Sequence, residues 1–212
     1  GTGTLSKSGN STLALMGDNS GLLGNVTVSS GTLDWGSNQI GPATPTAPTG
    51  DLSVGTDGII SGGGLGRFRN ITYSTNTTIP ITTSLNITGT GFLTKSGNST
   101  LTLTGDNSGL TGNIDVSGGG LTNSGSLTVA STKTFTVADG STFPNTGTGL
   151  FTNNGTFAIN GIFDFSGISG TQTLLGTIGG AIVAAEYRGG SNGLTFSWDE
   201  RGVGEGCLSE CG

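Results

Sequence analysis

Apolar and polar residues alternate in short runs along most of the chain, and turn-forming residues separate the runs. Residues 100–104 read Thr-Leu-Thr-Leu-Thr, which is the pattern of a β-strand with one buried face. Apolar pairs recur in the same way further on, at Leu127/Val129, Phe135/Val137, Leu150/Phe151, Phe157/Ile159 and Phe163/Phe165. Each run is too short to bury its face alone, so the pattern predicts strands that stack on one another into one continuous core.

An internal repeat organises these runs. Residues 1–33 and 89–121 align without a gap at an offset of 88 and are identical at 24 of 33 positions. In both copies an alternating strand is followed by Gly-Asp-Asn-Ser-Gly, a turn in which Asp and Asn bond their own backbone and Gly accepts positive φ. The two copies are expected to form equivalent coils. Their inward-pointing residues are predicted to be Leu13, Leu15, Leu101, Leu103, Ile114 and Val116.

The predicted fold is all-β: a right-handed parallel β-helix (β-solenoid) with one lateral loop insertion. We expect coils at 1–33, a Pro/Gly-rich lateral insert at 34–62, further coils at 63–198 and a Cys-containing tail at 199–212. Short steps between strands also suit a β-hairpin meander or a sandwich, which is the main structural alternative. Disorder of the bulk is disfavoured, because the net charge is only −6 and the apolar positions are periodic.

The predicted insert carries Pro42, Pro45 and Pro48 at every third position, which suits an extended polyproline-like path. Trp35 opens this segment. Two interpretations remain open at this point. The segment is either a surface excursion whose Trp covers the core, or an arm whose Trp contacts a neighbouring subunit.

The pattern G-T-G-x-L-[ST]-K-S-G-x-[ST]-T-L-x-L-x-G-x-N, followed by G and V/I-x-V, resembles the autotransporter-associated strand repeat of bacterial passenger proteins. Residues 1–33 and 89–121 carry it, including Lys7, Lys95 and the turn that ends in Gly24 or Gly112. The resemblance implies a parallel β-helix, export to the cell surface, no cofactor and no catalytic residues. The sequence departs from the family in lacking a C-terminal membrane barrel and in the segment 204–212, which is foreign to the repeat.

Composition excludes several classes of function. The chain has no His, and charged residues make up 9% of it, so catalysis by a His-based triad is excluded and enzyme function is not expected. The acidic balance argues against a nucleic-acid partner, and no apolar stretch is long enough to span a membrane.

Asp18 and Asp106 share one repeat position, where a turn role explains both, and the adjacent charges of Asp199-Glu200-Arg201 fit a solvated turn. No metal or cofactor site is predicted.

Cys207 and Cys211 are the only cysteines, and they are expected to form a disulfide within or between chains, or to remain two free thiols. A disulfide would place the protein outside the cytosol, at the cell surface or in the extracellular space. Asn-x-Ser/Thr sequons occur at Asn10, Asn25, Asn70, Asn76, Asn86, Asn98 and Asn154, and they matter only if the host glycosylates them.

Three classes of function follow. The leading hypothesis is a non-enzymatic extracellular subunit that self-assembles end to end into a fibre or surface layer, because the first coil carries neither a cap nor a blunting charge. Its candidate assembly contacts are Gly1, Thr2, Gly3, Thr4, Leu5 and Trp35. The second is an adhesin or autotransporter passenger fragment, with host or cell-surface glycans as possible partners. The third is ice binding through flat rows of threonine such as Thr100, Thr102 and Thr104.

Overall fold

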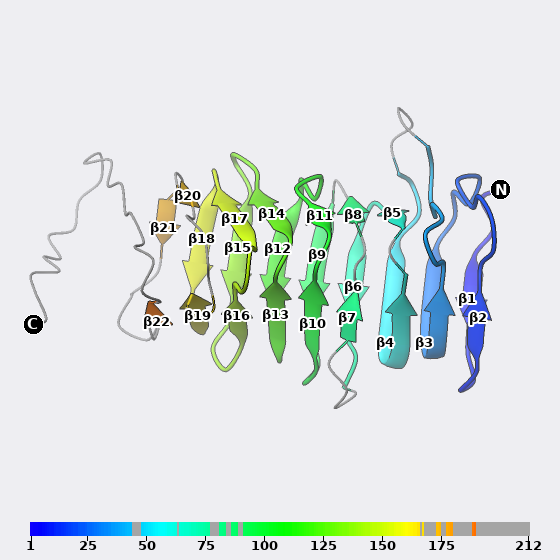
Figure 1. The fold of residues 1–212 in the computed structure, drawn as a ribbon, viewed down its shortest axis with the longest axis horizontal. Coiled ribbons are helices and arrows are strands. Elements are labelled where there is room, and N and C mark those ends of the chain that lie inside the picture. Colours follow the sequence, from blue (N-terminus) through cyan, green and yellow to red (C-terminus); the bar gives the residue numbers. More distant parts are fainter. Residues whose placement is uncertain are drawn as a thin grey trace, which may run out of the picture.

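The computed structural model describes residues 1–43, 48–62, 64–76, 81–83, 86–88, 91–165, 167, 173–174, 177–179 and 188–189. Its secondary structure is all β, with parallel strands stacked into a β-solenoid of about seven turns. Figure 1 shows the resulting rod, with β1 and β2 at one end and β21 and β22 towards the other. Every strand pair among the described residues is parallel, which confirms the predicted solenoid and excludes a hairpin meander there.

The strands form three long sides, and each turn contributes a strand to successive sides. The first side runs through β1 (Leu5–Lys7), β3 (Val26–Asp34), β4 (Leu52–Ser61), β6 (Ile71–Tyr73), β9 (Phe92–Lys95), β12 (Asn113–Val116), β15 (Thr134–Val137), β18 (Thr156–Ile159) and β21 (Thr177–Gly179), with β2 (Thr12–Ala14) beside β3. The second side runs through β7 (Ile81–Thr83), β10 (Thr100–Leu103), β13 (Gly120–Asn123), β16 (Thr142–Pro144), β19 (Ile162–Phe165) and β22 (Arg188–Gly189).

The third side is built from shorter strands. It contains a two-stranded sheet, β5 (Leu65–Arg67) and β8 (Asn86–Thr88), and a four-stranded sheet, β11 (Asp106–Asn107), β14 (Ser126–Val129), β17 (Leu150–Asn153) and β20 (Thr173–Leu174). Isolated parallel bridges from Asn19 to Ile40 and from Ile40 to Gly66 continue this side towards the first turn.

The core lies between the three sides, and alternate residues of each strand point into it. Leu101, Leu103, Ile114 and Val116 are buried, as predicted. Phenylalanine dominates the later turns, where successive rings pack edge to face or stacked; these rings belong to Phe135, Phe143, Phe151, Phe157 and Phe163. The core of the later turns therefore contains a continuous cluster of phenylalanine rings among its aliphatic side chains.

The two copies of the repeat occupy equivalent places in the solenoid, as predicted. Leu5 pairs with Val26 in the first copy, and Leu93 pairs with Ile114 in the second. On the following strand Leu13 pairs with Leu33, and Leu101 with Leu121. Leu13 and Leu15 also pack against the core, but they are only partly buried because the first turn has a neighbouring turn on one side only.

The predicted insert at 34–62 is too long. Residues 52–61 form β4, which pairs with β3 and β6 inside the first side, and Ile40 lies in the third side. The strands and bridges therefore leave only the segment between Ile40 and Leu52 for a lateral insert, and its described residues are 41–43 and 48–51. The glycines within β4 and the nearby prolines hid this strand from the sequence pattern.

Trp35 is fully buried, with its indole N–H 3.4 Å from the carbonyl oxygen of Gly64 and its ring 6.5 Å from that of Phe68. This position corrects the expectation that Trp35 contacts another subunit, since a large apolar ring is more stable inside the core than at an exposed edge. The structure agrees instead with the other interpretation, in which the Trp35 side chain packs on the core.

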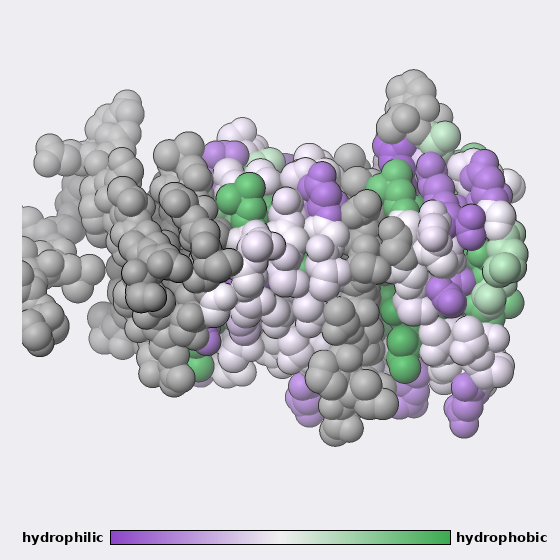
Figure 2. All heavy atoms as spheres, viewed as in Figure 1, coloured by the Kyte–Doolittle hydropathy of each residue, from purple (hydrophilic) through white to green (hydrophobic). Residues whose placement is uncertain are grey.

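Small hydroxyl residues and glycine are common on the outer surface. In Figure 2 most of the coloured middle of the rod is pale, and purple and green residues lie mainly towards the end that holds β1 and β2. On the first side, the outward positions of adjacent strands align Ser6, Thr27, Ser53, Thr72 and Thr94 in one row of hydroxyl groups.

Candidate functional site

Two lysines point into the solenoid instead of into solvent. Lys95 is fully buried and Lys7, its counterpart in the first copy, is 6% exposed. The Lys95 ammonium donates to the carbonyl oxygens of Ser96 (2.8 Å), Gly97 (3.1 Å) and Gly118 (3.2 Å). Gly118 belongs to the next turn, so the ammonium joins two turns at the corner between the first and second sides.

Lys7 has the same arrangement. Its ammonium donates to the carbonyl oxygens of Ser8 (2.9 Å), Gly9 (2.7 Å) and Ser30 (3.1 Å). Three acceptors match the three N–H groups of a lysine, so the charge is solvated by backbone dipoles and not by a carboxylate. We call these two sites the lysine cradles. They are structural elements of the repeat, and the sequence pattern showed the lysines without showing that they are buried.

Burial lowers the pKa of Lys95 to about 8, because removal from water disfavours the charged ammonium. The unfolded chain keeps this lysine near its ordinary pKa of 10.5. Between these two values the unfolded state binds more protons than the folded state, so the free energy of unfolding rises with pH.

We therefore expect the free energy of unfolding to increase by about 2 kcal/mol as the pH is raised from neutral to 9.5. Chemical denaturation at several pH values measures this change. Lys95→Met should flatten the profile relative to the wild type. The range should stop below 10, since burial raises the pKa of Tyr73 and this shift makes the folded state lose stability above that pH. Equal pH slopes for the variant and the wild type would contradict this assignment.

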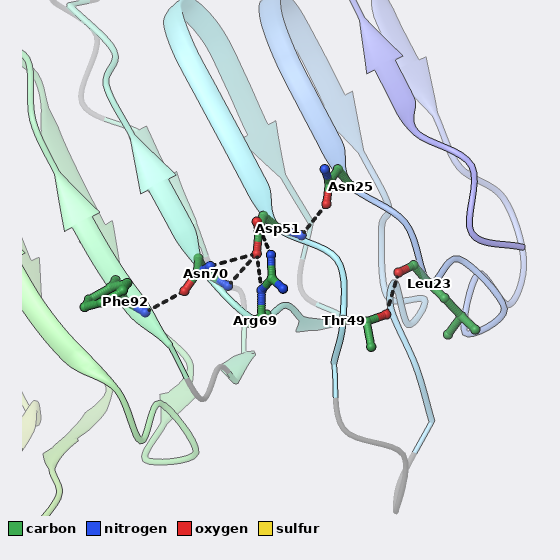
Figure 3. Close-up of polar contacts among 7 residues, drawn as sticks. All are labelled: Leu23, Asn25, Thr49, Asp51, Arg69, Asn70 and Phe92. Atoms are coloured by element: carbon green, nitrogen blue, oxygen red, sulfur yellow. Dashed lines mark hydrogen bonds and ion pairs between the residues drawn. The ribbon is translucent and has the colours of Figure 1, made fainter.

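A second polar network runs along the rod axis at the start of the first side. The side-chain oxygen of Asn25 accepts from the backbone N–H of Asp51 (3.0 Å), Asp51 accepts from the N–H of Asn70 (3.2 Å), and Asn70 accepts from the N–H of Phe92 (3.1 Å). Figure 3 shows these contacts passing from one turn to the next. Asn113 repeats the contact with the N–H of Thr134 at 3.0 Å. We call this series the Asx ladder.

Arg69 reinforces the ladder at Asp51. Its guanidinium donates to both carboxylate oxygens, at 3.0 and 2.7 Å (Figure 3). These hydrogen bonds, with that from the Asn70 N–H, hold the pKa of Asp51 below its usual value. The pair is partly exposed, so its contribution to stability is small and depends on salt.

The Asx ladder was not predicted, although each ladder residue directly precedes a buried apolar residue, as Asn25 precedes Val26.

The acidic turn of the repeat has the role that the sequence predicted. Asp18 accepts from the N–H of Ser20 (2.8 Å), and Asp106 accepts from the N–H of Ser108 (3.0 Å). Hydrogen bonds from these serines lower the pKa of both carboxyl groups. The two carboxylates lie four turns apart, as the strand order shows, so they do not form a catalytic pair.

The remaining candidate residues fall into three groups. Residues 1–5 run along the second turn, with Gly1 donating to Gly21 and accepting from Leu23, and Gly1–Thr4 are exposed. Cys207 and Cys211 lie outside the described residues. In the threonine rows, Thr102 lies between Thr82 and Thr122, whereas Thr100 lies beside Gly120, which interrupts its row.

In the described segments, the polar side chains of these sites form hydrogen bonds within their own turn or with an adjacent turn. Within them, no group of three or more His, Cys, Asp or Glu residues could hold a metal ion. No helix in the described part of the chain could cross a membrane. The lysine cradles, the Asx ladder and the acidic turns instead bind each turn to itself or to the next one.

No family model, curated protein or solved structure that was compared matches this chain.

Proposed function

We propose that this chain is a non-enzymatic extracellular structural protein, a β-solenoid subunit that assembles end to end into a fibre or surface layer. The observation that supports this function is that polar side chains form hydrogen bonds between adjacent turns. Lys7, Lys95, Asn25, Asp51 and Asn70 all donate or accept hydrogen bonds between adjacent turns. Such bonding ties each turn to the next and makes a stiff rod, which is what a building element requires.

The proposed setting is the cell surface or the extracellular space. The outer surface is rich in small, uncharged hydroxyl residues and carries few charges, which suits close side-by-side packing of rods. The proposed partner is therefore another copy of the same chain.

Light scattering and negative-stain electron microscopy of the purified chain test this function. We expect species with masses that are multiples of 20.9 kDa, and elongated particles that join into filaments or sheets as the concentration rises. A strictly monomeric protein across the accessible concentration range would contradict the proposal.

The repeat also supports a second candidate, the stalk of a surface adhesin. The Lys-Ser-Gly-Asn and Thr-Leu-x-Leu segments that resemble the autotransporter-associated strand repeat lie in equivalent coils. In that case the solenoid would hold a binding segment away from the cell. Binding of the purified chain to immobilised glycans or to host cells, without self-assembly, would favour the adhesin over the fibre subunit.

A further inference from the structure

The two copies of the repeat differ in chemistry at two outward positions of the first side. Phe92 in β9 stands where the first copy has Thr4, and Asp115 in β12 stands where it has Thr27. The inward residues of the same strands are identical or differ by one methylene group; they are Leu5, Lys7, Val26 and Val28 in the first copy and Leu93, Lys95, Ile114 and Val116 in the second. Because the first copy forms an equivalent coil with threonine at both positions, folding requires neither Phe92 nor Asp115.

These two changes stand apart from the other differences between the copies. Elsewhere the second copy has gained only hydroxyl residues, glycine or a slightly larger aliphatic residue. Phe92 is the only aromatic residue, and Asp115 the only charged one, that the second copy has and the first copy lacks at the same position. An aromatic ring and a carboxylate on outward positions both suit contact with a molecule outside the core.

Phe92 and Asp115 lie on neighbouring strands and form, with Thr94 and Asn113, a group of four outward side chains that we call the outer square. Phe92 pairs with Asn113, and Thr94 pairs with Asp115. Adjacent strands are about 4.8 Å apart and alternate residues of one strand about 6.6 Å apart, so one small ligand can reach all four side chains. The Phe92 side chain is 59% exposed, and the other three are partly exposed.

The Phe92 ring is held in place by the backbone beneath it. The Phe92 N–H donates to Oδ1 of Asn70 in the preceding turn at 3.1 Å, and Figure 3 shows the side chain extending away from Asn70. The next residue, Leu93, is 1% exposed, so the strand cannot turn over to bury the ring without exposing the core. An exposed ring on a fixed strand is preorganised for stacking against a ligand.

The polar members of the outer square offer both donors and acceptors. Oδ1 of Asn113 accepts from the N–H of Thr134 at 3.0 Å, which orients the amide and leaves its two N–H groups without an acceptor among the described residues. The Asp115 carboxylate has no hydrogen bond or ion pair within the part of the chain that the structure describes. The Thr94 hydroxyl can both donate and accept.

The charge of the outer square narrows the class of ligand. Lys95 is the other charged residue of β9 and β12, and its ammonium is held in its cradle, so these strands present one negative charge outward. An anionic ligand would be repelled by Asp115, and a cation would meet the N–H groups of Asn113 as well as the carboxylate. A sugar has hydroxyl groups that donate to a carboxylate and accept from an amide, and its C–H face packs on an aromatic ring.

We infer that the outer square is a binding site for one sugar residue of an uncharged glycan. The sugar ring stacks on Phe92, its hydroxyl groups donate to the Asp115 carboxylate, and they accept from the N–H groups of Asn113. The site is flat and open, so a dissociation constant on the order of 1 mM is expected for one chain. This inference goes beyond the structural function, since it holds for a single chain as well as for an assembled rod.

The test restores the residues of the first copy. Phe92→Thr with Asp115→Thr gives the second copy the pair that the first copy already folds with, and circular dichroism checks that the fold is kept. The matched control is Leu150→Thr, which removes a different exposed apolar side chain, 44% exposed, from the third side. The probes are an array of neutral, sialylated and uronate-containing glycans, followed by calorimetric titration with the neutral glycan that gives the strongest signal.

We expect the wild type to bind neutral glycans more strongly than their acidic forms. The double variant should bind at least about tenfold more weakly, because both the stacking ring and the carboxylate are lost, while Leu150→Thr should bind as the wild type does. Asp115→Asn should reduce the discrimination against acidic glycans. Thr4→Phe with Thr27→Asp, introduced into the double variant, rebuilds the square in the first copy, and restored binding supports the inference.

Three results would overturn the assignment. The first is a wild type that binds none of the glycans, or a folded double variant that binds them as strongly as the wild type does. The second is preferential binding of choline that is lost in high salt, which would make the outer square a cation site. The third is loss of self-association in the double variant, which would make these residues a subunit contact. Failure of the wild type to self-associate contradicts the structural function alone and leaves the glycan site standing.

Discussion

Leu103→Asp is expected to lower the free energy of unfolding by several kcal/mol, enough to prevent the central turns from folding. Leu103 is 1% exposed and lies in a strand that has a partner on each side. The substitution places a carboxylate among apolar side chains with no partner to compensate for its lost hydration. A whole domain has a free energy of unfolding of only about 5–15 kcal/mol, so one such change removes a large part of it.

The chain supplies two matched controls for this prediction. Thr102→Asp places the same carboxylate on the outward side of the same strand and should change stability by only about 0.5 kcal/mol. Leu15→Asp makes the same substitution at the equivalent position of the first copy, where the side chain is partly exposed, so it should cost less than Leu103→Asp. Denaturant unfolding of the three variants measures the order. Equal losses at Leu103 and Thr102 would refute the inward orientation of Leu103.

Gly112→Ala is expected to have an effect of similar size through a different cause. A Cβ atom at Gly112 would overlap the carbonyl oxygen of Gly91 in the preceding turn, so the two turns would have to separate at that corner. Backbone atoms on both sides of this contact are held by strands β9 and β12, which cannot move apart without losing ladder hydrogen bonds. We expect a loss of several kcal/mol, measured as a fall in the midpoint of chemical unfolding.

Two glycines provide the comparison. Gly24 occupies the same repeat position, and its added Cβ would overlap the carbonyl oxygen of Gly3. Gly3 lies in the exposed first turn and can move aside, so Gly24→Ala should be milder than Gly112→Ala. Gly21→Ala meets nothing within 4 Å and should be close to neutral. A Gly112→Ala protein as stable as Gly21→Ala would show that the turns do not approach as closely as described.

The fold was predictable wherever the alternation was strong. The run from Thr100 to Thr104 and its counterpart at Leu13 and Leu15 identified strands, and the constant offset of 88 placed them in equivalent coils. The prediction was wrong at β4, because Gly55 and Gly58 dilute its alternation and the prolines before it suggest a loop. The burial of Trp35 depends on Phe68 and Gly64, which lie too far along the chain for a local pattern to relate them.

The polar networks were harder to predict than the core. A lysine in a polar stretch is normally exposed, so nothing local marks Lys95 as buried. Its three acceptors are backbone carbonyls, which every residue possesses, and the third comes from the next turn. The Asx ladder is spread over turns of unequal length, with Asn25, Asp51 and Asn70 at irregular spacings, and so it escaped a search for a fixed period.

The equivalence of the two copies fixes the distance between their matching surface corners. Four strand steps along the first side separate β1 from β9, and steps of about 4.8 Å give a separation of about 19 Å. Asn10 and Asn98 are both exposed at the end of a Lys-Ser-Gly-Asn corner, and a whole number of turns places them along the same edge. The solenoid therefore presents the same polar corner twice, at a spacing that the number of intervening turns sets and that a change of side chains alone would not alter.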